Sequence, residues 1–301
     1  MKLVIAGGSG FIGSMLVQRL CERGDSLTLL SRKPAPSRGT SSMRWQAWQP
    51  GVPGAWEAEI DGADGVVNLA GEGIAAKRWT VRQKELIRSS RIDTTCAIVG
   101  AMAKAKAKPK FLINASAVGY YGACGDEMLT EKSAPGTDYL AQVCVSWERE
   151  AIKAQDYGVR VVLLRTGIVL GKNKGVLAKM VKPFQFFVGG PLGSGQQWMP
   201  WIHIEDEVDL ILFLAENENS RGPFNATAPH PVKMEEFCKA LAKVLKRPSW
   251  ASVPASVLTL VLGEMADMLL AGQRALPEAA RKLGYNFKYS IITEALESLA
   301  L

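Results

Sequence analysis

Three glycines spaced three residues apart follow a short apolar run at the start of the chain. The run Lys2-Leu-Val-Ile-Ala6 predicts a buried strand, and it leads directly into Gly7, Gly10 and Gly13 and then into an amphipathic stretch. Between a strand and a helix, this spacing lets the backbone turn tightly, approach a diphosphate and pack the helix close to the sheet. The pattern predicts a dinucleotide-binding turn with the phosphates at the helix N-terminus. The alternative is a glycine-rich turn that binds no nucleotide.

The end of the second predicted strand indicates which dinucleotide would bind. The apolar run Ser26-Leu-Thr-Leu-Leu30 is followed by Ser31, Arg32 and Lys33, with no acidic residue. A carboxylate at this place would bind the ribose 2′-hydroxyl and repel a 2′-phosphate, whereas an arginine forms charge-assisted hydrogen bonds to that phosphate. We therefore predict NADP(H) rather than NAD(H) as the cofactor. The alternative is that Arg32 and Lys33 simply end a solvated loop.

Strands and helices are predicted to alternate along the first half of the chain. Predicted strands lie at residues 2–6, 26–30, 43–48, 65–70, 110–114 and 160–164, with helices at 11–23, 80–106 and from 138 to before 158. This alternation predicts an α/β fold with a Rossmann-type doubly wound parallel sheet. We expect residues 1–166 to form the nucleotide-binding domain, with the sheet completed by parts of 196–228. Residues 167–301 would form a smaller, mostly helical substrate-side region that includes a C-terminal domain at about 248–298.

The ends of the predicted helices carry recognisable capping residues. Gly24 follows the first helix in the position where glycine commonly ends a helix. Thr80 and Asp138 are expected to cap the next two helices, and Asp206 is expected to cap a helix at 207–215. These residues define where each helix should begin or end.

Composition excludes several classes of protein and of site. The five cysteines among 301 residues include no Cys-x-x-Cys pair, so neither a disulfide framework nor a zinc site is expected, and a reducing cytoplasm fits best. With only two histidines, we expect no metal site. The formal charge of +7 is spread along the chain, which suits an anionic cofactor better than nucleic acid. No apolar run approaches the roughly 18 residues of a membrane span, so we expect no membrane partner.

Motifs along the whole chain resemble those of the extended short-chain dehydrogenases/reductases, and within them the atypical branch known as the epimerase family. These motifs are Asn68-Leu-Ala-Gly-Glu72, Arg78-Trp-Thr80, Ser90-Arg91, Ala117-Val-Gly-Tyr-Tyr-Gly122, Val143-Cys-Val-Ser-Trp-Glu148, Gln197-Trp-Met199, Trp201-Ile-His-Ile-Glu-Asp206 and Asn225-Ala-Thr-Ala-Pro229. The resemblance implies a nicotinamide cofactor, a small substrate with nucleotide-linked sugars among the candidates, and a homodimer formed through two long helices. The predicted cofactor-binding residues are Gly7, Ser9, Gly10, Phe11, Ile12, Gly13, Ser31, Arg32, Asn68, Leu69, Ala70, Gly71, Glu72, Arg165 and Thr166.

One residue pair of that family is missing from this chain. Short-chain dehydrogenases ordinarily carry Tyr-x-x-x-Lys on a helix, where the lysine lowers the pKa of the tyrosine that exchanges a proton with substrate. On the corresponding helix, Tyr139 is followed four residues later by Val143; the other alignment places Leu140 and Cys144 at the two positions. Both alignments lack the lysine, so the usual proton relay is in doubt.

Three hydroxyl residues are the candidates to replace that relay. Ser116 follows the fifth predicted strand, and Tyr120 and Tyr121 lie in a glycine-flanked turn near the same edge of the sheet. For Ser116 the alternative is a loop serine that bonds its own backbone, and for the tyrosines it is packing beneath the loop. Cys144 is expected to be a small buried residue rather than a nucleophile.

Two functions are compatible with these observations. The first is an NADP(H)-dependent oxidoreductase or epimerase that acts on a small substrate without the usual Tyr-x-x-x-Lys pair. The second is a catalytically silent NADP(H)-binding protein, a regulator or partner-binding module, because similar folds host non-catalytic roles.

Overall fold

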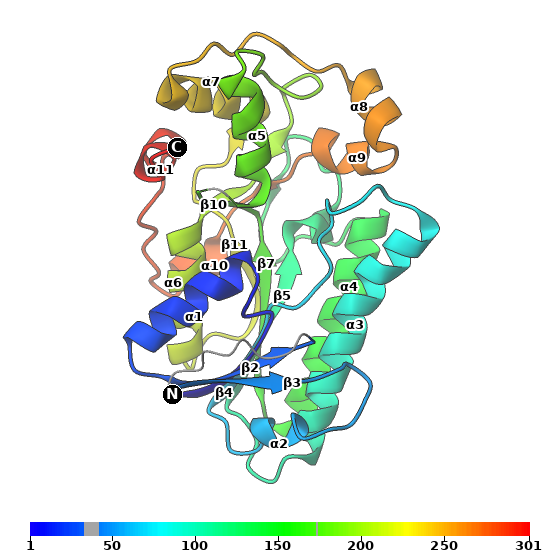
Figure 1. Ribbon diagram of the computed structural model, residues 1–301, viewed down its shortest axis with the longest axis vertical. Coiled ribbons are helices and arrows are strands. Elements are labelled where there is room, and N and C mark those ends of the chain that lie inside the picture. The colour runs from blue at the N-terminus through cyan, green and yellow to red at the C-terminus, as the bar shows by residue number, and fades with distance from the viewer. Residues whose placement is uncertain (33–41, 173) are drawn as a thin grey trace.

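A computed structural model describes residues 1–32, 42–172 and 174–301 of the chain. Its centre is a sheet of seven strands in the order β11-β7-β5-β4-β1-β2-β3, and every neighbouring pair is parallel (Figure 1). The strands are β1 (Lys2–Ala6), β2 (Ser26–Ser31), β3 (Met43–Ala47), β4 (Gly65–Asn68), β5 (Phe111–Ala117), β7 (Arg160–Thr166) and β11 (Gly222–Ala226). The predicted fold class is confirmed. The strand order reverses between β1 and β4, which is where ligands bind in such sheets.

Helices cover both faces of the sheet, which explains why its central strands are continuous apolar runs. Figure 1 shows α1 and α6 on one side, and α3 and α4 side by side on the other. The helices and 3-10 turns of this part are α1 (Phe11–Glu22), α2 (Glu57–Ile60), α3 (Val81–Lys104), η1 (Val118–Tyr121), α4 (Tyr139–Ile152), η2 (Lys153–Tyr157), α6 (Ile204–Glu216) and α10 (Glu278–Lys282). Each layer buries its own apolar core against the sheet.

The remaining elements gather beyond the carboxyl ends of the strands, in the upper part of Figure 1. They are α5 (Gly175–Gln185), α7 (Met234–Leu245), α8 (Ala255–Leu262), α9 (Met265–Leu270), α11 (Ile292–Ser298) and the short strands β6 (Met128–Leu129), β8 (Ile168–Leu170), β9 (Trp198–Met199), β10 (Trp201–His203), β12 (Val232–Lys233) and β13 (Arg274–Ala275). Helices α5, α7 and α11 share a core of their own that contains Phe184, Trp201 and Phe237. No helix among the described residues is both long and apolar enough to cross a membrane.

Most of the predicted helix ends are confirmed. Thr80 accepts a hydrogen bond from the Gln83 N–H at 3.1 Å, and Asp138 accepts one from the Ala141 N–H at 2.9 Å. Gly24 follows α1 with a φ of +81°, a backbone conformation that favours glycine. Local capping chemistry was therefore enough to place these boundaries.

The cap predicted at Asp206 is wrong. Helix α6 begins at Ile204, and its cap is His203, whose Nδ1 accepts a hydrogen bond from the Glu205 N–H at 3.2 Å. Burial lowers the pKa of His203 to about 4, so the ring is neutral and can accept this bond. The Asp206 carboxylate instead accepts hydrogen bonds from the N–H groups of Lys288 at 2.7 Å and Tyr289 at 2.9 Å. It ties the C-terminal segment to α6, a contact that no local pattern could reveal.

Candidate functional site

The glycine turn after β1 has the close packing that its spacing predicts. Gly7 has a φ of +84°, and a β-carbon placed on it would lie 2.6 Å from the carbonyl carbon of Leu69. A β-carbon on Gly13 would lie 2.2 Å from the Gly7 carbonyl oxygen. A side chain at either position would therefore collide with backbone atoms. The turn brings the carboxyl ends of β1 and β4 together at the place where the strand order reverses.

The first turn of α1 leaves backbone donors available at this edge. Gly10 provides no side-chain cap, and the first hydrogen bond of the helix is from the Ser14 N–H to the Gly10 carbonyl at 2.9 Å. Among the described residues, the N–H groups of Phe11, Ile12 and Gly13 have no hydrogen-bond partner. Unpaired donors at the positive end of a helix dipole suit a diphosphate group. The residues present therefore fit a dinucleotide.

Two predicted residues of the turn differ in their surroundings. Ser9 is exposed beside Gly10. The ring of Phe11 packs instead against Gly171, where an added β-carbon would lie 2.5 Å from the ring, and against Gly175. Phe11 thus links the start of α1 to the segment that follows β8.

The end of β4 is held by a buried hydrogen-bond network. The Asn68 side-chain amide donates to Asn114 Oδ1 at 2.7 Å and to Thr95 Oγ1 at 3.0 Å, and Asn68 Oδ1 accepts from the Ala70 N–H at 3.2 Å. Trp147 Nε1 also donates to Thr95 Oγ1, at 2.8 Å. With its own side chain occupied, Asn68 positions the predicted cofactor-binding backbone of Leu69, Ala70 and Gly71. The Glu72 N–H in turn donates to Ser90 Oγ at 2.9 Å.

The residues predicted to select the dinucleotide lie at the carboxyl end of β2. Ser31 is the last residue of the strand, and the Arg32 side chain is exposed next to it. An exposed guanidinium at this position can reach a group that lies along the sheet edge. Lys33 lies outside the described residues.

Ser116 is part of a buried ion-pair network rather than of a loop. Strand β5 continues to Ala117, so the prediction that Ser116 follows the strand is wrong. Its hydroxyl donates to Glu148 Oε1 at 2.7 Å. Arg165 donates to both oxygens of Glu148, from Nε and from Nη2, each at 2.8 Å. Burial alone would lower the pKa of Arg165, but the hydrogen bonds to Glu148 raise it.

The two candidate tyrosines are used differently. Tyr121 is 1% exposed, and its hydroxyl donates to Asn225 Oδ1 at 2.7 Å while accepting from Arg165 Nη1 at 3.1 Å. Burial raises the pKa of Tyr121 to about 12. Tyr120 is half-buried, and the Arg165 guanidinium carbon lies 3.4 Å from the centre of its ring. The Tyr120 hydroxyl has no hydrogen-bond partner among the residues the structure describes. Tyr120 is therefore the freer of the two phenols.

The structure decides between the two alignments of the missing Tyr-x-x-x-Lys pair. The Tyr139 hydroxyl donates to the Lys84 carbonyl at 2.5 Å, so this side chain faces α3. Leu140 packs beside Gly119 of η1, and Cys144 is buried close to Ser116. Leu140 and Cys144 thus occupy the face turned toward β5. Burial raises the pKa of Cys144 to about 12, and its predicted burial is confirmed.

Thr166, a predicted cofactor-binding residue at the end of β7, contacts Glu207, which was not among the predicted site residues. The Thr166 hydroxyl donates to Glu207 Oε1 at 2.8 Å. Glu207 is fully buried, and its other oxygen has no hydrogen-bond partner among the described residues. Burial raises the pKa of Glu207 to about 8, so the carboxyl group is mainly protonated at neutral pH. Cofactor contacts by Arg165 and Thr166 stay predictions.

Reasoning from the sequence missed three residues that lie at the candidate site: Glu148, Asn225 and Glu207. Glu148 and Asn225 belong to motifs quoted above, but nothing local shows that they bind Ser116 and Tyr121. Glu207 lies in the first turn of α6 directly after Glu205 and Asp206, where acids are common, so no local signal distinguished it. No group of three or more histidine, cysteine, aspartate or glutamate residues in the described part of the chain could hold a metal ion.

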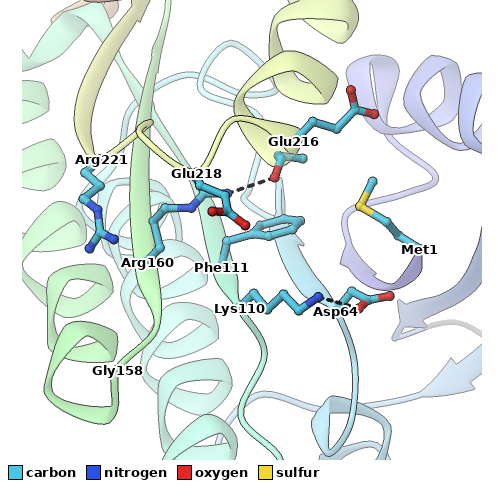
Figure 2. A pocket seen from close by; sticks show the side chains of 10 residues that line it. Met1, Asp64, Lys110, Phe111, Gly158, Arg160, Glu216, Glu218 and Arg221 are labelled. Atoms are coloured by element: carbon cyan, nitrogen blue, oxygen red, sulfur yellow. Dashed lines mark hydrogen bonds and ion pairs between the residues drawn. The ribbon is translucent and has the colours of Figure 1, made fainter.

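A separate hollow opens at the amino ends of the strands, opposite the glycine turn. It has a volume of about 330 Å³ and is lined by residues such as Asp64, Lys110 and Arg160 (Figure 2). Lys110 Nζ lies 3.6 Å from Asp64 Oδ1, and Arg160 donates to the carbonyls of Leu214 at 3.0 Å and Ala215 at 2.9 Å. Arg160 therefore satisfies the last carbonyls of α6. Lys110 and Arg160 are thus both engaged within the protein, whereas the predicted cofactor-binding residues lie at the opposite, carboxyl edge, which is the candidate site.

Comparison with known families matches nearly the whole chain. Residues 3–226 match the NAD dependent epimerase/dehydratase family, and residues 253–299 match a domain of unknown function, DUF1731. These two matches cover the sheet with its helices and the helices that follow α7.

Individual relatives are similar over the same extent. The chloroplastic SDR39U1 homolog of Arabidopsis thaliana, an epimerase family protein, is 44% identical over 99% of this chain and 86% of its own length. The epimerase family protein YfhF of Bacillus subtilis is 40% identical over 99% of this chain and 98% of its own. The crystal structure of human epimerase family protein SDR39U1, isoform 2, with NADPH superposes with a TM-score of 0.89 at 32% identity, covering 100% of this chain and 99% of that one.

Proposed function

The chain belongs to the NAD-dependent epimerase/dehydratase family, and on that basis we propose that it binds NADP(H) and acts as an oxidoreductase or epimerase on a small substrate. The single observation that carries the proposal is the glycine turn, with its unpaired N–H groups at the start of α1. The human relative solved with NADPH supports the choice of cofactor. Nucleotide-linked sugars are among the candidate substrates.

The chain's own residues would divide the binding task. The N–H groups of Phe11, Ile12 and Gly13 would hold the diphosphate, and Arg32 would bind the 2′-phosphate with charge-assisted hydrogen bonds. The backbone of Leu69 to Gly71 would contact the cofactor at the same edge of the sheet, beside Gly7. A bound nicotinamide would supply hydride transfer, and the protein would supply orientation and a proton donor.

Tyr120 is the proton donor that we propose among the three hydroxyl candidates. The hydroxyls of Ser116 and Tyr121 are already donated to Glu148 and Asn225 inside the protein. Tyr120 has a free hydroxyl within the described residues, and the Arg165 cation lies against its ring at 3.4 Å. We assign Ser116 and Tyr121 to positioning Arg165 beneath it.

A catalytically silent NADP(H)-binding protein is the second candidate function. It is favoured by the loss of the lysine, because Cys144 occupies the face toward β5 and is buried with a pKa of about 12. In that case the fold would retain the cofactor and report its presence to a partner. We further propose that residues 1–166 with β11 form the nucleotide-binding part, and that the chain works in the cytoplasm, where its five free thiols would stay reduced.

Titration of the purified protein with NADPH and NADH tests the cofactor. We expect NADPH to bind at least about tenfold more tightly, and Arg32→Ala to remove that difference, because a charge-assisted hydrogen bond contributes about 1.5–3 kcal/mol. Arg88→Ala, at an exposed arginine of α3, serves as the matched control and should bind NADPH normally. Equal affinity for the two nucleotides in the wild type would contradict the assignment.

Turnover separates the two functions. The protein is incubated with NADPH and a cell metabolite extract, and oxidation of the nicotinamide is followed by absorbance. Oxidation of NADPH that is abolished by Tyr120→Phe supports an enzymatic function with Tyr120 as the proton donor. Tight NADPH binding with no oxidation in any extract supports the silent protein.

A further inference from the structure

Arg91 of α3 is a charged residue at the carboxyl edge of the sheet, and it has no role in the function proposed above. We propose that its guanidinium binds an oxyanion, the phosphoryl or carboxylate group of a ligand, beside Gly71 at the carboxyl end of β4. The inference rests on the proposed function only in that a ligand occupies this edge of the sheet. It adds a residue and a chemical class to that site.

The guanidinium is held between the end of β4 and α4. A β-carbon placed on Gly71 would lie 3.2 Å from the guanidinium carbon and 3.4 Å from Nη2, so the arginine lies directly beneath this glycine. On its other side, the guanidinium carbon lies 5.3 Å from the centre of the Trp147 ring. The ring is fixed in turn by its hydrogen bond to Thr95. The cation therefore has a defined place before any ligand binds.

Arg91 lacks the partners that such a position normally demands. Within the described residues its only hydrogen bond is from Nη1 to the Ile87 carbonyl at 2.8 Å, and no carboxylate lies within 4.0 Å. A guanidinium has five N–H donors. Burial lowers the pKa of Arg91, and the Glu72 carboxylate acts on it only as a more distant charge. A half-buried cation without a counterion is unfavourable unless a ligand completes its surroundings.

Two arginines that are more deeply buried show how this protein satisfies a guanidinium that has a purely structural role. Arg165 pairs with both oxygens of Glu148, and Arg160 donates to the carbonyls of Leu214, Ala215 and Ser220. Arg91 forms neither kind of arrangement. Its Nη2, which makes no hydrogen bond within the described residues, lies beside Gly71. The planar donors of a guanidinium match the oxygens of a phosphoryl or carboxylate group.

Arg91 also lies where a ligand that extends along the carboxyl edge of the sheet would pass. The backbone of Leu69 and Ala70 adjoins Gly7, and Gly71 continues that segment toward Arg91. On the far side, Cys144 lies within electrostatic range of Arg91 and close to Ser116. A molecule that extends from the glycine turn toward β5 would pass this guanidinium. The oxyanion can belong to the cofactor or to the substrate, and the experiment separates these sources.

Calorimetry on Arg91→Gln tests the proposal with two kinds of probe. NADPH alone tests the cofactor; uridine diphosphate and citrate, added to protein saturated with NADPH, test a phosphorylated and a carboxylated substrate. We expect Arg91→Gln to weaken at least one of these affinities about tenfold or more, and Arg91→Lys, which keeps the charge but not the planar donors, to weaken it less. Arg88→Gln, three residues earlier on the same helix and exposed, should change none of them.

Each outcome has a definite meaning. Weaker NADPH binding by Arg91→Gln assigns the oxyanion to the cofactor, and unchanged NADPH binding with weaker probe binding assigns it to the substrate. A variant that binds NADPH and both probes within twofold of the wild type overturns the proposal, as does unchanged NADPH binding when the wild type binds neither probe. If the wild type binds no NADPH, the proposed function fails, while the two probes, then added without cofactor, still test Arg91.

Discussion

Two arginines contact consecutive residues of α4 and differ in their pairing: Arg165 forms a buried ion pair, and Arg91 forms none within the described residues. Arg165 pairs with Glu148 in a network that includes Ser116 and Tyr121, and it is 3% exposed. Arg91 stacks on Trp147 with one hydrogen bond and no carboxylate within 4.0 Å, among the residues the structure describes. The region around Arg165 is complete within the protein, whereas the region around Arg91 is completed only by a ligand.

This difference separates residues that build the site from residues that can act in it. A buried ion pair whose partner is removed leaves an uncompensated charge, so the members of the Arg165 region should be detected mainly in stability measurements. A cation without an ion-pair partner contributes little to stability, and its removal should be detected mainly in ligand binding. The same reasoning distinguishes Tyr121, whose hydroxyl is occupied, from Tyr120, whose hydroxyl is free within the described structure.

The largest effect is expected for Arg165→Met. The variant leaves Glu148 buried without its cation, and we expect it to lower the free energy of unfolding by about 3–5 kcal/mol. Urea unfolding followed by circular dichroism measures the loss. Replacing both partners, as Arg165→Met with Glu148→Met, should recover part of it. If Arg165→Met lowers the free energy of unfolding by less than about 1 kcal/mol, Arg165 is no more important for stability than Arg91 is expected to be.

Glu207 gives the next largest effect, and it depends on pH. Because burial raises the pKa of Glu207 to about 8, its contribution to stability is complete below about pH 4.5 and is lost as the pH rises through 8. Glu207→Gln should remove this loss and be more stable than the wild type by a few kcal/mol at pH 9, since each unit of pKa shift corresponds to about 1.4 kcal/mol. Urea unfolding at pH 5, 7 and 9 measures it. Parallel pH dependence in the two proteins would contradict the buried, protonated state.

Tyr121→Phe is expected to have a smaller effect on stability. Removing the hydroxyl leaves Asn225 Oδ1 without its donor and Arg165 Nη1 without one of its acceptors, at a cost of about 1–3 kcal/mol. Tyr120→Phe is the matched control and should change the free energy of unfolding by less than about 0.5 kcal/mol. Thermal or urea unfolding of both variants checks the contrast, and equal losses would show that the two phenols have the same role.

The smallest effect on stability is expected for Arg91→Gln without ligand. Since the guanidinium makes one hydrogen bond and no ion pair in the described structure, the free energy of unfolding should stay within about 1 kcal/mol of the wild type. Arg88→Gln gives the reference for an exposed arginine on the same helix. Urea unfolding of the two variants is the measurement. A loss approaching that of Arg165→Met would make Arg91 a structural residue.

Much of the fold could be predicted because its signals are local. The glycine spacing after β1, the apolar strands and the caps at Thr80 and Asp138 depend on residues within a few positions of one another. The prediction at Asp206 was wrong because its partners, Lys288 and Tyr289, lie 82 and 83 residues away in the sequence. Local capping chemistry cannot show that a carboxylate is engaged by a distant segment.

The sequence by itself determined the nucleotide-binding turn, the alternation that produces the parallel sheet, and the absence of the Tyr-x-x-x-Lys pair. Only the tertiary structure decided that, within the described residues, the Tyr120 hydroxyl has no hydrogen-bond partner and Arg91 has no ion pair, and which face of α4 is turned toward β5. The physical reason is that hydrogen bonds and burial depend on residues brought together by folding. Tyr121 and Asn225, for example, are 104 positions apart in the chain, yet the Tyr121 hydroxyl lies 2.7 Å from Asn225 Oδ1 in the folded protein.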